Sequence, residues 1–333
     1  MELPDEKLLE MRMCDLGLRV GGTLLDDAIR ELRRDLRRAG LRFRPHFWLG
    51  EEWFTPDGVP GVAIPFYLAH PRLVTLEERQ VYEAEGGTPD SCLRILRHEA
   101  GHAIDNAFRL RRRRDRQRLF GRSSQPYPQF YTPRPYSRRY VIHLESWYAQ
   151  SHPDEDFAET FAVWVSTPDD VWRKRYADWP ALKKLEWVHR EMTELRGKLP
   201  PVRSKRRVEP LHTVQMTLGE YYAAKREHYG LDYPPVDERD LRRIFSAAPK
   251  YKHNMPAARF VRKVRREVRR TVAQWTGIYQ YTIDQVLADI IERSKELELR
   301  LTVPEEEAKL GFGILLAVQT MNYIHSGRQR VAL

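Results

Sequence analysis

The spacing of apolar residues changes within the N-terminal part of the chain. Residues 23–39 carry a row of aliphatic side chains at helical spacing: Leu25, Ile29, Leu32 and Leu36. Arginine and aspartate occupy the opposite face, so this stretch predicts an amphipathic helix. Residues 41–49 and 61–68 are instead rich in aromatic and branched side chains, and turn-forming residues separate them. We expect two strands of a small sheet there, at its edges, because Pro45 and Pro65 have no N–H to donate.

Two longer helices are predicted further along the chain. The first begins near residue 89 and continues into the basic run 111–114. The second has Pro153 at its first position and ends near residues 167–168. Between them, residues 120–140 are rich in Pro, Tyr, Ser and Arg and keep no helical period. That composition predicts a loop between the two helices.

The chain beyond about residue 170 is mostly helical in pattern and carries no distinctive motif. Residues 199–210 are basic and contain proline, which makes them a candidate linker. Residues 259–275 have the pattern of a strongly basic helix. Short strands near the start and helices elsewhere predict an α+β fold.

Composition narrows the class of protein. Hydrophobic residues make up 41% of the 333 positions, enough for a buried core, and charged residues make up 31%. The net charge of +10 is spread over several helices, which suits either acidic partners or a plain solvated surface. Cys14 and Cys92 are too few for a disulfide framework or a cysteine zinc site, so a reducing cytoplasm is expected. We expect no signal peptide and no membrane span.

The string HEAGH, residues 98–102, is the strongest candidate for chemistry and lies inside the first long helix. Residues four apart share a helix face, so His98 and His102 can offer imidazole nitrogens to one ion. Glu99 is turned away from that pair and can reach a water on the metal. Gly101 costs roughly 1 kcal/mol against Ala in a helix interior, which indicates tight packing against a neighbouring backbone.

The third ligand decides the type of zinc site. The metzincin pattern requires a glycine and a further histidine after the motif. This chain has Asp105 and Phe108 at those places, so the metzincin class is excluded. Zinc suits two imidazoles with a carboxylate and then keeps a fourth position for water. The third ligand is therefore expected on another segment.

The second long helix offers two carboxylates for that purpose. Glu155 and Glu159 are four residues apart and share one face. One of them can bind the ion, while the other accepts the free N–H of a ligating histidine. Spacing alone does not decide between the two glutamates. His143 and His152 are also candidate ligands.

Two strings together resemble a known family. HEAGHAID at residues 98–105 and HPDEDFAET at residues 152–160 resemble the core of the anthrax lethal factor type of gluzincin. They are closer still to bacterial putative zinc-binding metallopeptidases. The resemblance covers roughly residues 40–170. It implies a zincin-like metallopeptidase domain at 1–195, with a small N-terminal sheet, an HExxH helix and a Glu-bearing helix. A mostly helical C-terminal region would follow at 196–333.

The resemblance also implies roles for single residues. Glu155 would be the third zinc ligand, and Glu159 would support a ligand from the second shell. Tyr148, seven positions before Glu155, would stabilise the oxyanion. Asp105 would orient a ligand or tie the two helices together. In such folds the strand before the active helix pairs with extended peptide, and residues 61–68 are the candidate.

The sequence thus predicts a gluzincin-type zinc metallopeptidase with a single Zn²⁺ ion on His98, His102 and Glu155. Glu99 would be the general base and Tyr148 the oxyanion donor. The expected substrate is a peptide or protein, acidic or extended in character. The alternative is a basic nucleic-acid-binding or scaffold protein with a structural zinc site, although no recognised nucleic-acid motif supports it.

Overall fold

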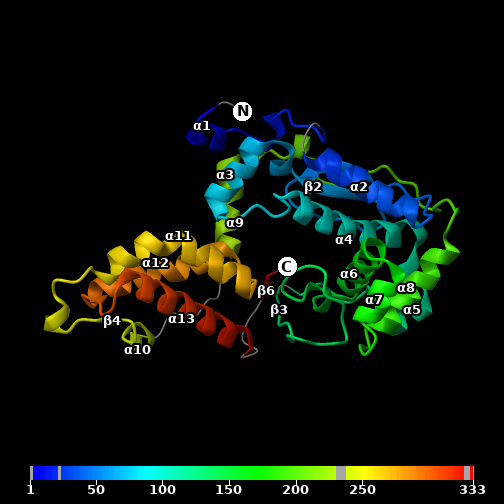
Figure 1. Ribbon diagram of the computed structural model, residues 1–333. Helices are drawn as coiled ribbons and strands as arrows, with labels where there is room; N and C mark the ends of the chain where they lie inside the picture. Colours follow the sequence, from blue (N-terminus) through cyan, green and yellow to red (C-terminus); the bar gives the residue numbers. More distant parts are fainter. Residues whose placement is uncertain (1–2, 22–23, 129, 230–237, 326–330, 333) are drawn as a thin grey trace. The chain divides into compact units, whose positions relative to one another are not determined.

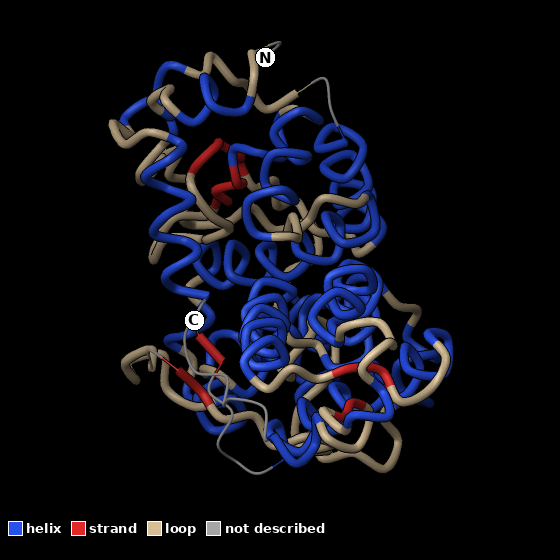
Figure 2. The backbone as a smooth tube through the Cα atoms, turned by 90° about the vertical axis from the view of Figure 1, so that its left-hand side faces the viewer, coloured by secondary structure: helices blue, strands red, loops and turns tan. Residues whose placement is uncertain are grey.

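The chain forms two compact units. The computed structural model describes residues 3–21, 24–128, 130–229, 238–325 and 331–332. The first unit consists of Met1–Gln80 with Ala84–Tyr222, and the second of Val81–Glu83 with Ala223–Ala332. Helices make up most of each unit, and the strands are short (Figure 1, Figure 2). Many helices with a small sheet are compatible with the expected α+β class.

The elements have the following bounds. The first unit contains helices α1 (Asp5–Leu9), α2 (Leu24–Arg38), α3 (Pro71–Val81), α4 (Pro89–Phe108), α5 (Arg114–Phe120), α6 (Pro153–Ser166), α7 (Asp169–Arg175) and α8 (Leu182–Glu194). Its strands are β1 (His46–Gly50), β2 (Gly61–Pro65) and β3 (Phe130–Tyr131). Helix α9 (Leu218–Tyr229) continues into the second unit, which contains α10 (Glu238–Leu241), α11 (Ala257–Thr276), α12 (Gln280–Glu296), α13 (Glu305–His325), β4 (Phe245–Ser246), β5 (Arg300–Leu301) and β6 (Val331–Ala332).

Strands β1 and β2 form a small parallel sheet in which Trp48 pairs with Ala63. The prediction of strands in these two stretches is confirmed, but both strands are shorter than expected. β2 ends at Pro65, and residues 66–69 form a 3₁₀ turn. On its other side, the Ala63 N–H donates to the Phe54 carbonyl at 2.9 Å. At Ala63 β2 therefore has partners on both sides, which argues against residues 61–68 as the strand that pairs with peptide.

Residues 199–210 are not a free linker, so that prediction is wrong. The Val202 N–H donates to the Ala107 carbonyl at the end of α4, at 3.1 Å. The indole Nε1 of Trp48 donates to the Val208 carbonyl at 2.9 Å, and His46 Nε2 is 2.9 Å from the Arg206 carbonyl. These long-range hydrogen bonds hold the stretch against α4 and β1, and the local composition does not reveal them.

Helices α4 and α6 pack against each other in the core of the first unit. Thr88 caps α4 through a reciprocal pair of hydrogen bonds with Ser91, and α4 ends where Arg109 adopts a left-handed conformation. Pro153 begins α6, as expected. Apart from the end of α5 and the short strand β3, the described residues of 120–140 have no helix or strand, which confirms the predicted loop. The two predicted metal-binding helices are therefore neighbours in space (Figure 1).

The closest approach of the two helices is at Gly101. A Cβ atom built there would lie 2.7 Å from the Ala158 Cα and 3.0 Å from the Ala158 carbonyl oxygen. Real Cβ atoms do not come so close to backbone, so only glycine fits between the helices at this spacing. The expectation of tight packing against a neighbouring backbone is confirmed.

Gly101→Ala should lower both stability and metal affinity. Overpacking of a core commonly costs about 1–3 kcal/mol, which exceeds the gain of about 1 kcal/mol in helix propensity. The displaced α6 would also carry Glu155 away from the histidines of α4. Thermal unfolding, together with a zinc competition titration, measures the two effects.

Gly313→Ala is the matched control for this change. Gly313 also lies inside a helix, α13, but a Cβ built there meets nothing within 4 Å. We expect this substitution to stabilise the protein slightly through helix propensity alone. Equal responses of the two variants would contradict the tight contact at Gly101.

The second unit has its own core, in which Phe245, Phe260 and Phe312 meet. The predicted basic helix is part of α11, whose valines face this core. Arg265 and Arg269 of α11 form ion pairs with buried Asp284 at 2.5 and 2.7 Å. Part of the positive charge of α11 is therefore used inside the unit.

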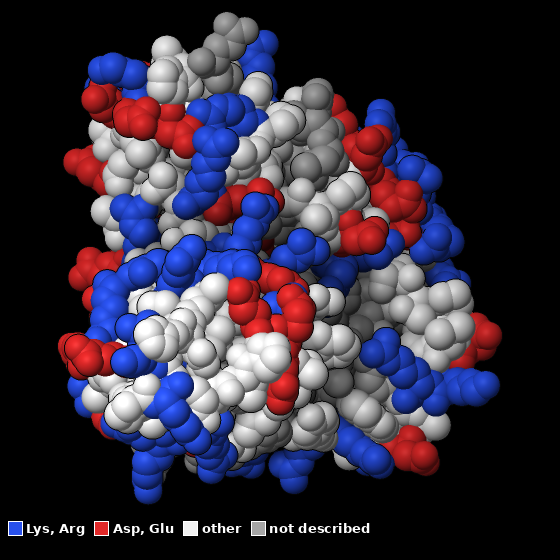
Figure 3. Space-filling model, turned by 60° about the vertical axis from the view of Figure 1, so that its left-hand side comes forward, with Lys and Arg blue, Asp and Glu red and all other residues white. Residues whose placement is uncertain are grey.

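The surface of the protein is rich in Lys and Arg. On the face in Figure 3 these side chains are widely distributed, with smaller groups of Asp and Glu between them. Among the described residues, no helix combines the length and the apolar character that crossing a membrane requires. The division into a catalytic domain and a helical region stays a prediction, since it concerns function as well as compactness.

Candidate metal centre

Three side chains from α4 and α6 converge in the core of the first unit. His98 Nε2 lies 2.9 Å from Glu155 Oε2 and 3.1 Å from His102 Nε2. The third edge, from His102 Nε2 to Glu155 Oε2, is 3.1 Å. All three residues are buried. Two imidazole nitrogens and one carboxylate oxygen thus form a nearly equilateral triangle, a group that could hold a metal ion.

The chemistry of this donor set fits zinc. Zinc binds imidazole nitrogen at about 2.0–2.1 Å and carboxylate oxygen at about 2.0–2.2 Å, so tetrahedral ligand atoms lie roughly 3.3 Å apart. The observed edges of 2.9–3.1 Å are only slightly shorter. The three ligand atoms need to move apart only slightly to take in a zinc ion, which side-chain adjustments can supply. Nitrogen ligands also favour zinc over calcium or magnesium, which prefer oxygen.

Glu159 supports His98 from behind. Its Oε1 lies 2.8 Å from His98 Nδ1, and its Oε2 accepts a hydrogen bond of 2.8 Å from the Leu144 N–H. A carboxylate at Nδ1 keeps the ring proton there and turns the lone pair of Nε2 toward the triangle. The structure therefore places Glu155 at the triangle and Glu159 behind it, and their roles as ligand and supporting residue stay predictions.

The carboxylates favour positive charge at the two imidazoles. Burial lowers the pKa of His98, but hydrogen bonds with Glu155 and Glu159 outweigh burial and raise this pKa well above its usual value. Burial raises the pKa of Glu155, but the two histidines hold it well below its usual value. Protons or a divalent cation can supply this positive charge, so metal binding would release protons.

The other candidate ligands lie in different environments. His143 Nε2 is 2.9 Å from the Arg94 carbonyl. His152 is the N-cap of α6, where its Nδ1 accepts a hydrogen bond from the Asp154 N–H. Its Nε2 lies 2.9 Å from the Gln125 carbonyl. Both rings have partners of their own, and neither joins the triangle.

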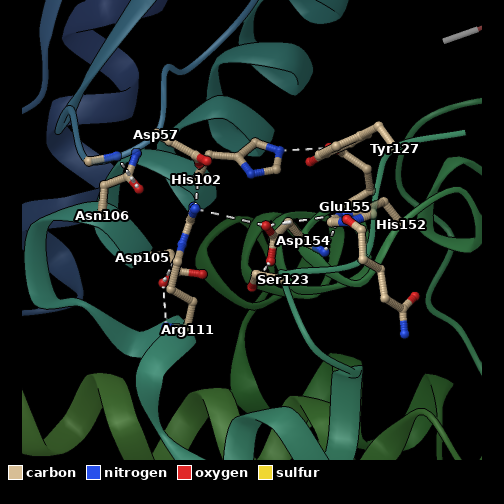
Figure 4. Close-up of polar contacts among 12 residues, drawn as sticks. Asp57, His102, Asp105, Asn106, Arg111, Ser123, Tyr127, His152, Asp154 and Glu155 are labelled. Atoms are coloured by element: carbon tan, nitrogen blue, oxygen red, sulfur yellow. Dashed lines mark hydrogen bonds and ion pairs between the residues drawn. The ribbon is translucent and has the colours of Figure 1, made fainter.

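Asp105 ties helices together. Its Oδ2 accepts a hydrogen bond of 2.8 Å from Arg116 of α5, and the same guanidinium nitrogen donates to Asp154 of α6 at 2.7 Å. Arg116 is fully buried, and its guanidinium lies over the ring of Phe157. This network joins α4, α5 and α6, which favours the second of the two roles expected for Asp105. Figure 4 shows Asp105, Ser123 and Asp154 in this region.

Glu99 is held from outside α4. The hydroxyl of Thr55 donates to Glu99 Oε2 at 2.8 Å. Thr55 belongs to a turn that Asn106 anchors, since the Asn106 amide donates to the carbonyls of Pro56 and Val59 at 2.9 Å each. The carboxylate of Glu99 is buried with one oxygen fixed by Thr55 and does not take part in the triangle.

The segment that carries the triangle is similar to a known protein family. Residues 91–196 match the family model described as "Putative zinc-binding metallo-peptidase". The match covers about a third of the chain. The match contains all of α6 and nearly all of α4, so the triangle lies within it. The family suspected from the HEAGHAID and HPDEDFAET strings is confirmed. Comparisons with curated proteins and with solved structures gave no match.

Within the metallo-peptidase segment, Tyr148 lies beside the triangle. It begins a 3₁₀ turn, Tyr148–Gln150, just before α6. Its ring centroid is 5.5 Å from that of His98. Burial, together with the charges of Glu155 and Glu99, raises the pKa of its hydroxyl well above the usual value. The hydroxyl therefore stays protonated and can donate a hydrogen bond.

Tyr127 also reaches the triangle of the metallo-peptidase segment, and its role was not predicted. Its hydroxyl donates to Glu155 Oε1 at 2.8 Å, while Glu155 Oε2 faces the two histidines. The Tyr127 ring stacks on His152, with centroids 3.8 Å apart and an interplanar angle of 20°. About half of the side chain, 52%, is exposed. Tyr127 thus fixes the outer oxygen of Glu155 from the rim of the site (Figure 4).

Sequence signals for the missed residues of the candidate metal centre are weak. Tyr127 lies in a tyrosine-rich loop without periodicity, so nothing separates it from its neighbours. Thr55 precedes Pro56 in a turn that is distant in sequence from α4. His152 has the clearest signal, because a polar residue before proline at a helix start is a typical N-cap.

Proposed function

We propose that the protein is a gluzincin-type zinc metallopeptidase that hydrolyses peptide bonds. The observation that carries this proposal is the buried triangle of His98, His102 and Glu155 within the family segment. Structural zinc sites have four protein ligands, whereas catalytic sites have three and an open position. Among the described residues the group contains three ligands, which supports a catalytic site.

His98, His102 and Glu155 would hold the ion. When bound, zinc supplies a Lewis acid that polarises a carbonyl and lowers the pKa of a water to about 7. Glu99 takes the proton of the attacking water and delivers it to the nitrogen of the leaving amine. Thr55 fixes one oxygen of Glu99, which leaves the other to exchange the proton.

Tyr148 is the proposed oxyanion donor. Its hydroxyl stays protonated, and its ring packs beside His98, so it can donate to the negative charge that develops on the carbonyl oxygen. Removal of one such donor costs roughly 2.7–4 kcal/mol of transition-state stabilisation in a well-studied protease. Tyr127 is proposed as a positioning residue, since it contacts the ligand Glu155.

Tyr127→Phe should weaken zinc binding by roughly 10–100-fold, the usual effect of removing a partner of a metal ligand. Without the hydroxyl, Glu155 Oε1 loses its hydrogen bond and the carboxylate can rotate away from the histidines. A competition titration with a coloured chelator measures the affinity. Tyr148→Phe is the matched control, because it should keep zinc affinity and lower turnover. Wild-type zinc affinity in Tyr127→Phe would refute the positioning role.

The proposed activity is tested by digestion of a broad peptide library with the purified, full-length protein. We expect one zinc per chain by elemental analysis and cleavage that a chelator abolishes and added zinc restores. A zinc-loaded protein that cleaves no peptide would favour the alternative of a structural zinc in a binding or scaffold protein.

Acidic or extended peptides remain the proposed substrates, but the basic run 111–114 gives limited support. Arg111 forms an ion pair with Asp57 and lies 3.6 Å from Asp105. Arg113 forms an ion pair with buried Glu191. These pairs neutralise part of the run, so cations that could receive an acidic chain have to be sought elsewhere on the first unit.

A further inference from the structure

A groove with a cavity volume of about 560 Å³ lies in the first unit, and its lining does not include the metal triangle. Its lining comes mainly from two parts of the chain: α2 with residues 41–46 forms the first wall, and residues 199–205 form the second. None of the residues that line the groove belongs to the triangle or touches it through a hydrogen bond described above. The groove is therefore a separate feature.

Six cationic side chains line this groove, all of them exposed: Arg33, Arg37, Arg42, Arg44, Arg203 and Lys205. The lining contains no Asp or Glu. Within the described part of the chain, none of the six forms an ion pair, although the protein contains 47 acidic residues. The groove thus collects positive charge that the protein does not neutralise itself.

Other arginines of α2 do have acidic partners, so the lack of ion pairs is specific to the groove. Arg34 and Arg38 form ion pairs of 2.8 Å with acidic residues one turn away on the same helix. Arg33 and Arg37, which face the groove, do not. The uncompensated arginines of α2 are therefore those at the groove.

The structure holds these like charges together. A hydrogen bond from the Val202 N–H to the Ala107 carbonyl anchors the wall 199–205. Just beyond this wall, the carbonyls of Arg206 and Val208 form hydrogen bonds with side chains of β1. In the first wall, Arg33 and Arg37 lie on the regular helix α2. Backbone fixed in this way keeps the six cations in one groove, where they repel one another, and a bound anion would relieve the repulsion.

Both walls add an apolar contribution. Leu41 and Phe43 are buried residues of the first wall, and Leu199, Pro200 and Val202 belong to the second. An acidic polypeptide offers both carboxylates for bidentate pairing with arginine and aliphatic side chains for these apolar residues. Single-stranded nucleic acid would need exposed aromatic rings for stacking. Of the two aromatic rings in the lining, Phe43 is buried, and His46 is only partly exposed and stacks on Trp48.

We propose that this groove binds an extended, acidic segment of a polypeptide. Arginines of α2 and of residues 42–44 face the acidic side chains from one wall, and Arg203 and Lys205 face them from the other. Binding does not involve the metal triangle, so the proposal stands whether or not the protein hydrolyses peptides.

The test measures fluorescence anisotropy of a short labelled peptide that alternates Glu with Leu. Full-length Glu99→Gln protein is used as the parent so that the probe is not cleaved. We expect saturable binding that weakens as ionic strength rises. The same peptide with Gln in place of Glu should not bind, and a labelled oligothymidylate should bind more weakly than the acidic peptide.

Two double substitutions on opposite walls, Arg37→Glu with Arg44→Glu and Arg203→Glu with Lys205→Glu, should each weaken binding at least roughly tenfold, since each exchanges attraction for repulsion. Arg262→Glu with Arg266→Glu is the matched control. These exposed arginines of α11 give the same change in net charge, and binding should hardly change. Thermal melts check that all variants fold.

Three outcomes would overturn the proposal. The first is equal loss in the α11 control, which would show a diffuse effect of net charge. The second is loss on one wall only, which would show that the groove is not the site. The third is tighter binding of the oligothymidylate than of the peptide, which would assign the groove to nucleic acid.

Discussion

Glu99→Gln should keep zinc and lose peptide hydrolysis. The glutamine has the size and shape of glutamate, and its carbonyl oxygen can still accept the hydrogen bond that Thr55 donates to Glu99. Glu99 is not part of the triangle, so zinc content should equal that of the wild type. An amide cannot take up the proton of the attacking water. General base catalysis typically raises the rate 10²–10⁴-fold, so turnover should fall at least roughly 100-fold.

Single-turnover peptide cleavage and elemental analysis of the same sample measure the two effects together. Glu145→Gln is the matched control, because Glu145 is exposed on the connection between the two metal helices and should be replaceable without loss. Turnover of Glu99→Gln at the wild-type rate would exclude the base assignment. Loss of zinc in this variant would mean instead that Glu99 supports the ion.

Glu155→Ala should lose zinc far more completely than Glu159→Ala. The first change removes one corner of the triangle and leaves two imidazoles, which cannot hold the ion at the affinity of three ligands. The second removes the acceptor for His98 Nδ1 and for the Leu144 N–H, but leaves every ligand atom in place. Removing an outer partner of this kind costs roughly 10–100-fold in metal affinity.

Zinc content after dialysis against a graded series of chelator concentrations distinguishes the two variants. The alanine variants also leave buried histidines without a carboxylate partner, so their folding is checked by circular dichroism. Glu155→Gln and Glu159→Gln preserve volume and provide a second pair. The same zinc retention in both members of either pair would reverse the choice of Glu155 as the ligand.

The part of the site that depends on helical spacing could be predicted from the sequence. Four-residue spacing on one helix is enough to bring His98 and His102 together, and the apolar pattern around them indicates a buried helix. The position of Glu155 depends on a contact between two helices, and Glu155 lies 53 residues after His102 in the sequence. Only the resemblance to the family connected them, and spacing alone left Glu155 and Glu159 equivalent.

The rest depends on contacts that leave no trace in local sequence. Tyr127 reaches Glu155 from a loop whose composition suggests only a polar connection. Residues 199–210 have the composition of a linker, yet hydrogen bonds with β1 and α4 order them. Such partners are set by tertiary packing, which overrides the local preference of a stretch rich in proline and basic residues.

The backbone contact between Gly101 and Ala158 bears on which ions the centre accepts. Calcium takes six to eight ligands at about 2.3–2.6 Å, so it needs a wider ring of donors than zinc does. Widening the triangle means separating α4 from α6, which would open a void where the two main chains now touch. If the proposed ion is bound, discrimination by ionic radius would depend on the interhelical distance, and a glycine that binds nothing would contribute to the choice of metal.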